Sequence, residues 1–108
     1  MKFYVDINKL NWTIEEVDTR SAELIVDNKS CFGVCKYLTQ EIFIDASLKE
    51  DKKCQTLKHE LTHAFLYCHL LEKKENYTEE ELCEFVAIYS DEIIRIANEC
   101  SNMFFNNR

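Results

Sequence analysis

The first part of the chain alternates between apolar and polar positions in several short runs. The alternation covers residues 2–7 and returns at residues 12–17. A period of two is typical of a half-buried strand. Two further apolar runs, 34–37 and 41–45, are separated by a few residues that include Thr39 and Gln40, and this arrangement predicts a hairpin. We therefore expect a small twisted sheet, antiparallel or mixed, of about three to four strands.

The segment between these runs is less regular. Residues 21–26 fit neither the helical nor the strand period, so a short helical turn and a strand both remain open. Residues 27–30 are polar and predict a turn. Gly33 is the one glycine of the chain, and it could adopt a positive φ or allow another segment to approach the backbone closely.

A helix is predicted to follow Leu48, because apolar residues then recur at intervals of three and four. Its apolar face is formed by Cys54, Leu57, Leu61, Ala64, Phe65 and Cys68. His59 and His63 project from the opposite side, in line with Leu66 and Leu70. A helix that is apolar on two sides is normally packed between two elements. We expect one face to pack on the sheet and the histidine face to look toward the last helix.

The last helix is predicted to begin at Thr78, because Thr78 and Glu81 match a capping box after the polar link 73–77. Its main apolar stripe comprises Leu82, Phe85, Val86, Tyr89, Ile93 and Ile96. The helix should end near Cys100, and residues 101–108 should fray. The fold class predicted from these elements is α+β.

Composition and charge narrow the possible functions. A chain of 108 residues is long enough for one compact domain, so we expect residues 1–108 to form a single domain. The net charge of −7, without a basic stripe, argues against nucleic acid and anionic membranes and favours a protein or peptide partner. We found no signal segment, so the six cysteines are expected to be free thiols in the cytoplasm. A cysteine nucleophile or a separate cysteine-zinc site is disfavoured, because the cysteines match neither local signature.

The candidate chemistry lies in the pentapeptide His59-Glu60-Leu61-Thr62-His63. Two histidines four residues apart on a helix can bind one metal ion. A glutamate between them can take a proton from a water on the metal, which is the pattern of zinc-dependent peptide hydrolysis. The pentapeptide therefore predicts a Zn²⁺ site with His59 and His63 as ligands and Glu60 as the general base.

A catalytic zinc needs a third protein ligand, and the glutamates at the start of the last helix are the candidates. Glu80 and Glu84 share one face, so Glu80 could bind the metal while Glu84 orients a histidine as a hydrogen-bond acceptor. Glu81 is the rival ligand, although it has a competing role in the capping box. His69 points about 100 degrees away from the other two histidines and is expected to be an ordinary residue at the border of the surface.

The run Leu57 to Tyr67, with Ile42 to Asp45 before it and Glu80 to Ala87 after it, resembles the minimal ImmA/IrrE-like zincin metallopeptidases, many of which are encoded by phages and mobile elements. The resemblance covers roughly residues 33–96. It implies a gluzincin-type core, in which His59 and His63 bind zinc, Glu60 is the base and Glu80 or Glu81 is the third ligand. Where Thr62 stands, the larger members of the family have glycine.

The expected function is therefore a zinc metalloendopeptidase that cleaves a peptide bond, with a repressor or another regulatory protein as the substrate that the resemblance implies. Tyr37 is a candidate to stabilise the oxyanion, beside a structural role as a cross-strand aromatic residue. The alternative is a non-catalytic protein-binding module of a mobile element, in which the metal site is vestigial or structural.

Overall fold

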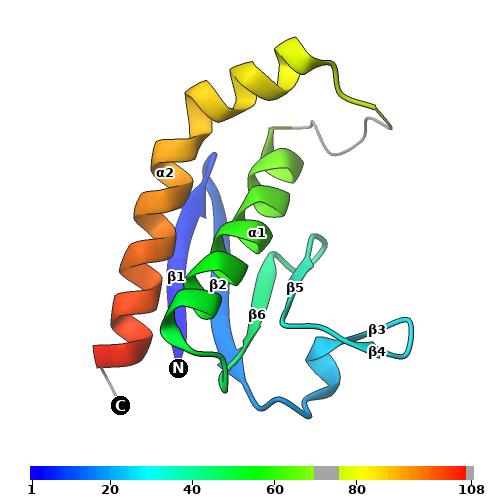
Figure 1. Ribbon diagram of the computed structural model, residues 1–108, viewed down its shortest axis with the longest axis vertical. Coiled ribbons are helices and arrows are strands. Elements are labelled where there is room, and N and C mark those ends of the chain that lie inside the picture. Colours follow the sequence, from blue (N-terminus) through cyan, green and yellow to red (C-terminus); the bar gives the residue numbers. More distant parts are fainter. Residues whose placement is uncertain (70–75, 107–108) are drawn as a thin grey trace.

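The computed structural model describes residues 1–69 and 76–106 and has an α+β fold. Strands β1 (Lys2–Ile7) and β2 (Leu10–Val17) come first, followed by the short 3₁₀ helix η1 (Ala22–Leu24). The two-residue strands β3 (Ile25–Val26) and β4 (Lys29–Ser30) form a separate small ribbon. Strands β5 (Gly33–Lys36) and β6 (Glu41–Asp45) then lead into the helices α1 (Glu50–Cys68) and α2 (Glu79–Asn106). Figure 1 shows this order.

The main sheet is mixed and has the strand order β1-β2-β6-β5. The pairs β1–β2 and β5–β6 are antiparallel hairpins, whereas β2 and β6 run parallel. Tight turns close the hairpins: Asn8 and Lys9 have positive φ between β1 and β2, and Asp27 and Asn28 have positive φ between β3 and β4. Asparagine and aspartate tolerate this conformation better than most residues, so these turn sequences favour the hairpins. Strand β5 lies at one edge of the sheet.

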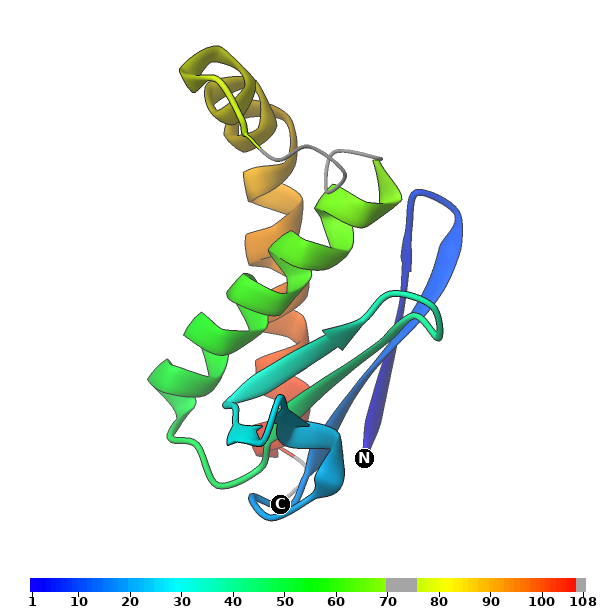
Figure 2. The same ribbon diagram turned by 90° about the vertical axis from the view of Figure 1, so that its right-hand side faces the viewer.

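Both helices cover the same face of the sheet (Figures 1 and 2). The core between the layers consists of apolar side chains from the strands and from both helices: Ile7, Trp12, Ile14, Ile42, Ile44, Leu57, Leu61, Ala64, Phe65, Ile93, Ile96, Ala97 and Phe104. Burial of this apolar surface is the main source of stability for such a fold. The pentapeptide 59–63 lies in the middle of α1, so this core also fixes its orientation.

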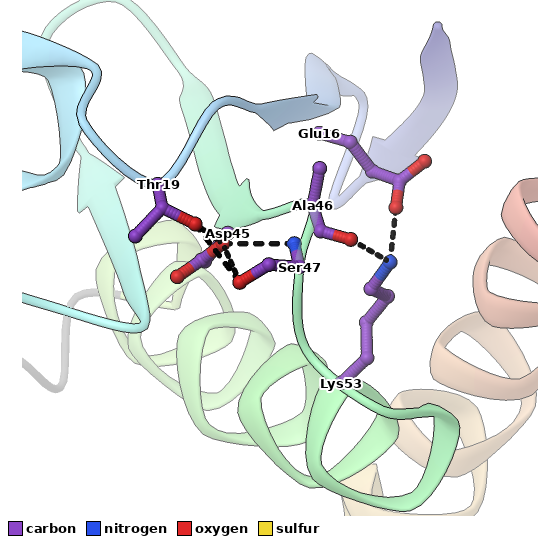
Figure 3. Close-up of polar contacts among 6 residues, drawn as sticks. All are labelled: Glu16, Thr19, Asp45, Ala46, Ser47 and Lys53. Carbon is purple, nitrogen blue, oxygen red and sulfur yellow. Dashed lines mark hydrogen bonds and ion pairs between the residues drawn. The ribbon is translucent and has the colours of Figure 1, made fainter.

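Two buried side chains, Asp45 and Lys53, make the polar contacts that hold the start of α1 against the sheet (Figure 3). The buried Asp45 carboxylate accepts hydrogen bonds from the Thr19 hydroxyl at 2.7 Å, the Ser47 backbone N–H at 2.9 Å and the Ser47 hydroxyl at 2.8 Å. The fully buried Lys53 ammonium donates to the Glu16 carboxylate and, at 3.1 Å, to the Ala46 carbonyl oxygen. A buried charge needs such partners. These contacts therefore set the point at which β6 turns into α1.

Most of the predicted elements are present. The strands at 2–7, 12–17 and 41–45 are confirmed with small shifts of their ends, and the predicted strand 34–37 is β5 one residue earlier. Residues 21–26, which were left open, contain both a helical turn and a short strand. The capping box is confirmed, since the Glu81 N–H donates to the Thr78 hydroxyl at 3.1 Å and the Thr78 N–H to the Glu81 carboxylate at 3.2 Å. The coarse fold class, with a mixed sheet and two helices, is also confirmed.

The prediction that α2 ends near Cys100 is wrong. The helix continues to Asn106, and Ser101 and Phe104 on its last turns are buried. Phe104 belongs to the core, so tertiary packing holds a segment that local sequence suggested would fray. Leu70 and most of the predicted polar link lie outside the described residues.

Neither described helix is long and apolar enough to cross a membrane. All six cysteines are free thiols, as expected.

The Asp45 contacts predict that the free energy of unfolding depends on pH. Burial alone would raise the pKa of Asp45, but the hydrogen bonds from Thr19 and Ser47 and the charge of Lys53 outweigh it, so the pKa lies below its ordinary value of 3.8. The carboxylate therefore stabilises the fold fully above pH 3.8, and this contribution is lost as the pH falls through the lowered pKa. Asp45→Asn should lower the free energy of unfolding by about 1 kcal/mol at neutral pH. The difference from the unsubstituted protein should shrink in acid.

Urea unfolding at neutral pH and at several acidic pH values measures this difference. Asp6→Asn is the matched control, because Asp6 is exposed on β1, and it should change stability less. A difference for Asp45→Asn that stays constant into strong acid would contradict the assigned role.

Candidate functional site

The pentapeptide lies on two successive turns of α1, where its side chains differ sharply in exposure. His59 is exposed and His63 is half-buried, whereas Glu60 is only 7% exposed. The two imidazole rings are adjacent, with centroids 5.0 Å apart and planes inclined by 72°. The structure therefore brings together the two predicted histidine ligands and sets the predicted base deeper than either of them.

The turn after β5 contacts the histidine pair through Tyr37. Its hydroxyl lies 3.4 Å from Nδ1 of His63. The Tyr37 ring stacks on Tyr67 of α1, with centroids 5.0 Å apart and planes inclined by 7°. Tyr67 in turn meets the edge of Trp12. Tyr37 is thus positioned by packing on an aromatic residue of the helix, not by the cross-strand contact expected for it, and its hydroxyl reaches the candidate site.

Gly33 allows β5 to approach α1 closely beside Glu60. A Cβ atom at position 33 would lie 2.8 Å from Cγ2 of Thr56, 3.0 Å from Cγ of Glu60 and 3.1 Å from Cδ1 of Ile44. Such distances are too short for ordinary van der Waals contact. The φ of Gly33 is not positive, so close approach is the reason why glycine is needed here.

Two adjoining cavities open beside the pentapeptide. One has a volume of about 270 Å³ and is lined by Val26, Cys31, Gly33, Val34, Cys35, Tyr37, His59, Glu60 and His63. The other has a volume of about 310 Å³ and is lined by Cys31, Phe32, Gly33, Lys52, Gln55, Thr56, His59 and Glu60. They share Cys31, Gly33, His59 and Glu60, so both cavities border the candidate base. Sites of this size can hold a few side chains of an extended peptide.

Burial shifts the acidity of the groups in the site. It raises the pKa of Glu60, an effect that the nearby His59 partly opposes. It lowers the pKa of His63, with the charge of His59 acting in the same direction. A neutral imidazole can donate a lone pair to a metal, and a carboxylate with a raised pKa is a better proton acceptor. Burial, with smaller effects of Glu60 and Cys68, raises the pKa of the Cys35 thiol to about 12. Cys35 is therefore a poor nucleophile at neutral pH.

The prediction that His59 and His63 face the last helix is wrong. They line a cavity together with β5 and the segment before it, and His63 meets Tyr37. The other flank of α1 contacts α2, where Phe65 lies 5.9 Å and His69 4.3 Å from Tyr89 between ring centroids. The helical period indicated that the two flanks differ, but it did not indicate which neighbour each flank would meet. His69 does not join the other histidines and is half-buried at the border, as expected.

The candidate third ligands lie on α2, apart from the histidine pair. Glu80 and Glu84 are exposed, while Glu81 is bound to Thr78 in the capping box. Glu81 and Glu84 line a different cavity, together with His69. Across residues 1–69 and 76–106, no three histidine, cysteine, aspartate or glutamate side chains are placed so as to hold one metal ion. The donors present thus fit two ligand positions of a zinc site, and the third is not assembled in this arrangement.

Comparison with known proteins gives no match. No family model matches the sequence, and no curated protein or solved structure is significantly similar to it. The resemblance to ImmA/IrrE-like peptidases therefore rests on the motif residues alone.

Sequence reasoning named Tyr37 as a candidate residue of the site, and it singled out Gly33 without placing it there. It missed Cys31, Phe32 and Lys52, which line the cavities beside His59. Helical spacing could have found Lys52, which lies two turns before His59 on the same face of α1. No local pattern could have found Cys31 and Phe32, because the packing of the segment before β5 against α1 brings them there.

Gly33→Ala tests the close approach of β5 to Glu60. The added methyl group must displace β5 or the Thr56 and Glu60 side chains, so the free energy of unfolding should fall by about 1–3 kcal/mol. Thr56→Ser removes the nearest obstructing atom, Cγ2, and keeps the hydroxyl that donates to the Lys52 carbonyl oxygen.

The double variant Gly33→Ala/Thr56→Ser should therefore lose less stability than the sum of the two single changes. Urea unfolding of the four proteins completes the double-mutant cycle. Strict additivity would show that Gly33 and Thr56 are not coupled through this contact.

Proposed function

We propose that this protein is a zinc-dependent endopeptidase. The observation that carries the proposal is a buried carboxylate, Glu60, on the same helix turns as two adjoining imidazoles and at the wall shared by two cavities. Burial raises the pKa of this carboxylate, and groups with shifted pKa values are typical of sites of proton transfer. A surface helix with a purely structural role has no reason to bury a glutamate side chain beside two histidines.

Strand β5 supports a peptide substrate. It pairs with β6 on one side and, among the described residues, with no strand on the other. An extended peptide can add to such an edge through backbone hydrogen bonds. Val34 and Cys35 of β5 line the same cavity as His59 and His63. A peptide bound along β5 would therefore pass the candidate base.

The roles of the residues follow from their positions. His59 and His63 would hold the zinc ion, which would supply Lewis acidity to polarise the scissile carbonyl and to lower the pKa of a water toward about 7. Glu60 would take the proton of the attacking water and deliver it to the leaving amine, so no net proton is left on the enzyme. The Tyr37 hydroxyl, held beside His63, would donate a hydrogen bond to the oxyanion that develops on the carbonyl.

Glu80 remains our proposed third ligand, with Glu84 as the acceptor that orients a histidine and Glu81 as the rival ligand. Because Glu80 lies outside the cavities beside His59, its ligation requires the beginning of α2 to approach that histidine. By the resemblance described above, the substrate would be a repressor or another regulatory protein.

Glu60→Gln tests the role of the base. The amide keeps the size of the side chain but cannot take a proton, so cleavage should fall about 100-fold to 10,000-fold while bound zinc is retained. Mass spectrometry of a digested peptide library measures cleavage, and elemental analysis of the purified protein measures zinc. His59→Ala is the control that should lose both.

A protein that purifies without zinc at neutral pH, and does not take it up when zinc is added, would refute the peptidase. Bound zinc without any cleavage dependent on Glu60 would favour the non-catalytic binding module.

A second test concerns the third ligand. Glu80→Ala should lower zinc affinity by at least about tenfold, because a lost ligand costs more than a lost outer-shell partner. Glu81→Ala removes the capping box, so it should instead lower stability by about 1 kcal/mol. Competition with a zinc-binding dye measures affinity, and thermal unfolding without metal measures stability. If both variants bind zinc as tightly as the unsubstituted protein, the third ligand is Glu84 or a residue outside this segment.

A further inference from the structure

The first half of α2 exposes large apolar side chains. Leu82, Val86 and Ile88 are 52%, 57% and 56% exposed, and Phe85 and Tyr89 beside them are half-buried. Leu82, Phe85, Val86 and Tyr89 share one side of the helix, and together with Ile88 on the flank of that side they form what we call the α2 apolar surface. Figures 1 and 2 show that this part of α2 extends beyond the C-terminal end of α1. Farther along the same helix, Ile93 and Ile96 are buried in the core. The apolar stripe of α2 therefore continues past the element that covers it, and such an exposed patch is typical of an interaction site.

A cavity of about 280 Å³ opens within this surface. It is lined by His69, Glu81, Glu84, Phe85, Ile88 and Tyr89, none of which lines the cavities beside His59. Its aromatic walls are held in place, because Tyr89 stacks on His69 with centroids 4.3 Å apart and meets Phe85 at 5.1 Å. The cavity therefore joins aromatic rings to the exposed Glu84 carboxylate. Rings and a carboxylate together suit a lysine or arginine, whose stem is apolar and whose end is cationic.

The charged residues near the α2 apolar surface indicate which charge a partner should carry. Residues 79–94 contain five glutamates and one aspartate, and no lysine, arginine or histidine. Two copies of this helix, packed face to face, would bring like charges together. Nucleic acids and anionic membranes would be repelled in the same way. A partner segment with both apolar and basic side chains would match the surface in both respects.

We propose that the α2 apolar surface docks a basic amphipathic helix of a partner protein. The apolar side chains of that helix cover Leu82 and Val86, and one of its lysines or arginines enters the cavity between Tyr89 and Glu84. This is a helix-in-groove contact, in which apolar anchors recur at three- and four-residue spacing. It uses none of His59, Glu60 and His63, but Glu84 is also the acceptor proposed above for a zinc-bound histidine, so docking is tested without added zinc.

The proposal is tested with a fluorescently labelled helical peptide that has leucines at three- and four-residue spacing and lysines elsewhere. A second peptide carries glutamate at every lysine position. Fluorescence anisotropy with the full chain should show binding of the leucine–lysine peptide and not of the leucine–glutamate peptide. Leu82→Ser/Val86→Ser/Ile88→Ser should weaken binding at least about tenfold, because it removes the apolar anchors and leaves every charge in place. These side chains are exposed, so the fold should be retained.

Ile94→Ser is the matched control. Ile94 is also exposed on α2 but lies on another flank, so its substitution should leave peptide affinity unchanged. Glu84→Lys should weaken binding through charge alone. The proposal is overturned if the triple serine variant binds as tightly as the unsubstituted chain, since binding would then be unspecific charge attraction. It is also overturned if neither peptide binds, or if sedimentation shows a dimer of the chain that the triple variant abolishes.

Discussion

Gly33 has no side chain, and for this reason β5 can lie directly against the turn of α1 that carries Thr56 and Glu60. The rest of the candidate site depends on this contact. It buries Glu60, it places β5 alongside His59, and it sets the distance at which the following turn brings Tyr37 to His63. Gly33 pairs with Ile44, and directly after it, at the C-terminal end of β6, the Asp45 and Lys53 contacts fix where α1 begins. The start of α1 is therefore held by buried polar groups. Its middle packs closely on β5 because Gly33 has no side chain, and the pentapeptide keeps a fixed orientation relative to the strand.

Local patterns predicted those elements whose stability is decided by their own sequence. Alternation gave the strands, because each has one face on the core, and the Thr78–Glu81 capping box gave the start of α2. The parallel pairing of β2 with β6 was not predicted, since partners separated by a long connection leave no local signal. The extension of α2 to Asn106 was missed for a related reason: Phe104 is buried against residues distant in sequence.

The same distinction applies to the candidate site: neighbours on one helix could be predicted from the sequence, and neighbours from other elements could not. The spacing of His59, Glu60 and His63 on one helix guarantees that they are neighbours, and the structure places them so. The neighbouring element could not be derived from the spacing. A helical wheel gives the angle between the flank of His63 and the flank of Phe65, but not whether β5 or α2 lies opposite each. The position of the glutamates on α2 relative to the histidines likewise depends on how the chain passes from α1 to α2, which no motif encodes.

Charge and apolar surface on α2 have to be considered together. A run of glutamates on a solvent-exposed helix needs no explanation by itself, and single exposed aliphatic residues are common. Here the chain places Leu82, Val86 and Ile88 among acidic residues, on the part of α2 that α1 does not reach. Of the six acidic residues in 79–94, Glu92 is paired with Arg95. A helix face that only contacts water would not expose large apolar side chains. A face that binds a second copy of the chain would not concentrate one sign of charge. The apolar and acidic residues together therefore favour a partner of opposite charge. In our proposals, β5 and the middle of α1 form the site for chemistry, and the start of α2 supplies its third ligand and a surface for recognition.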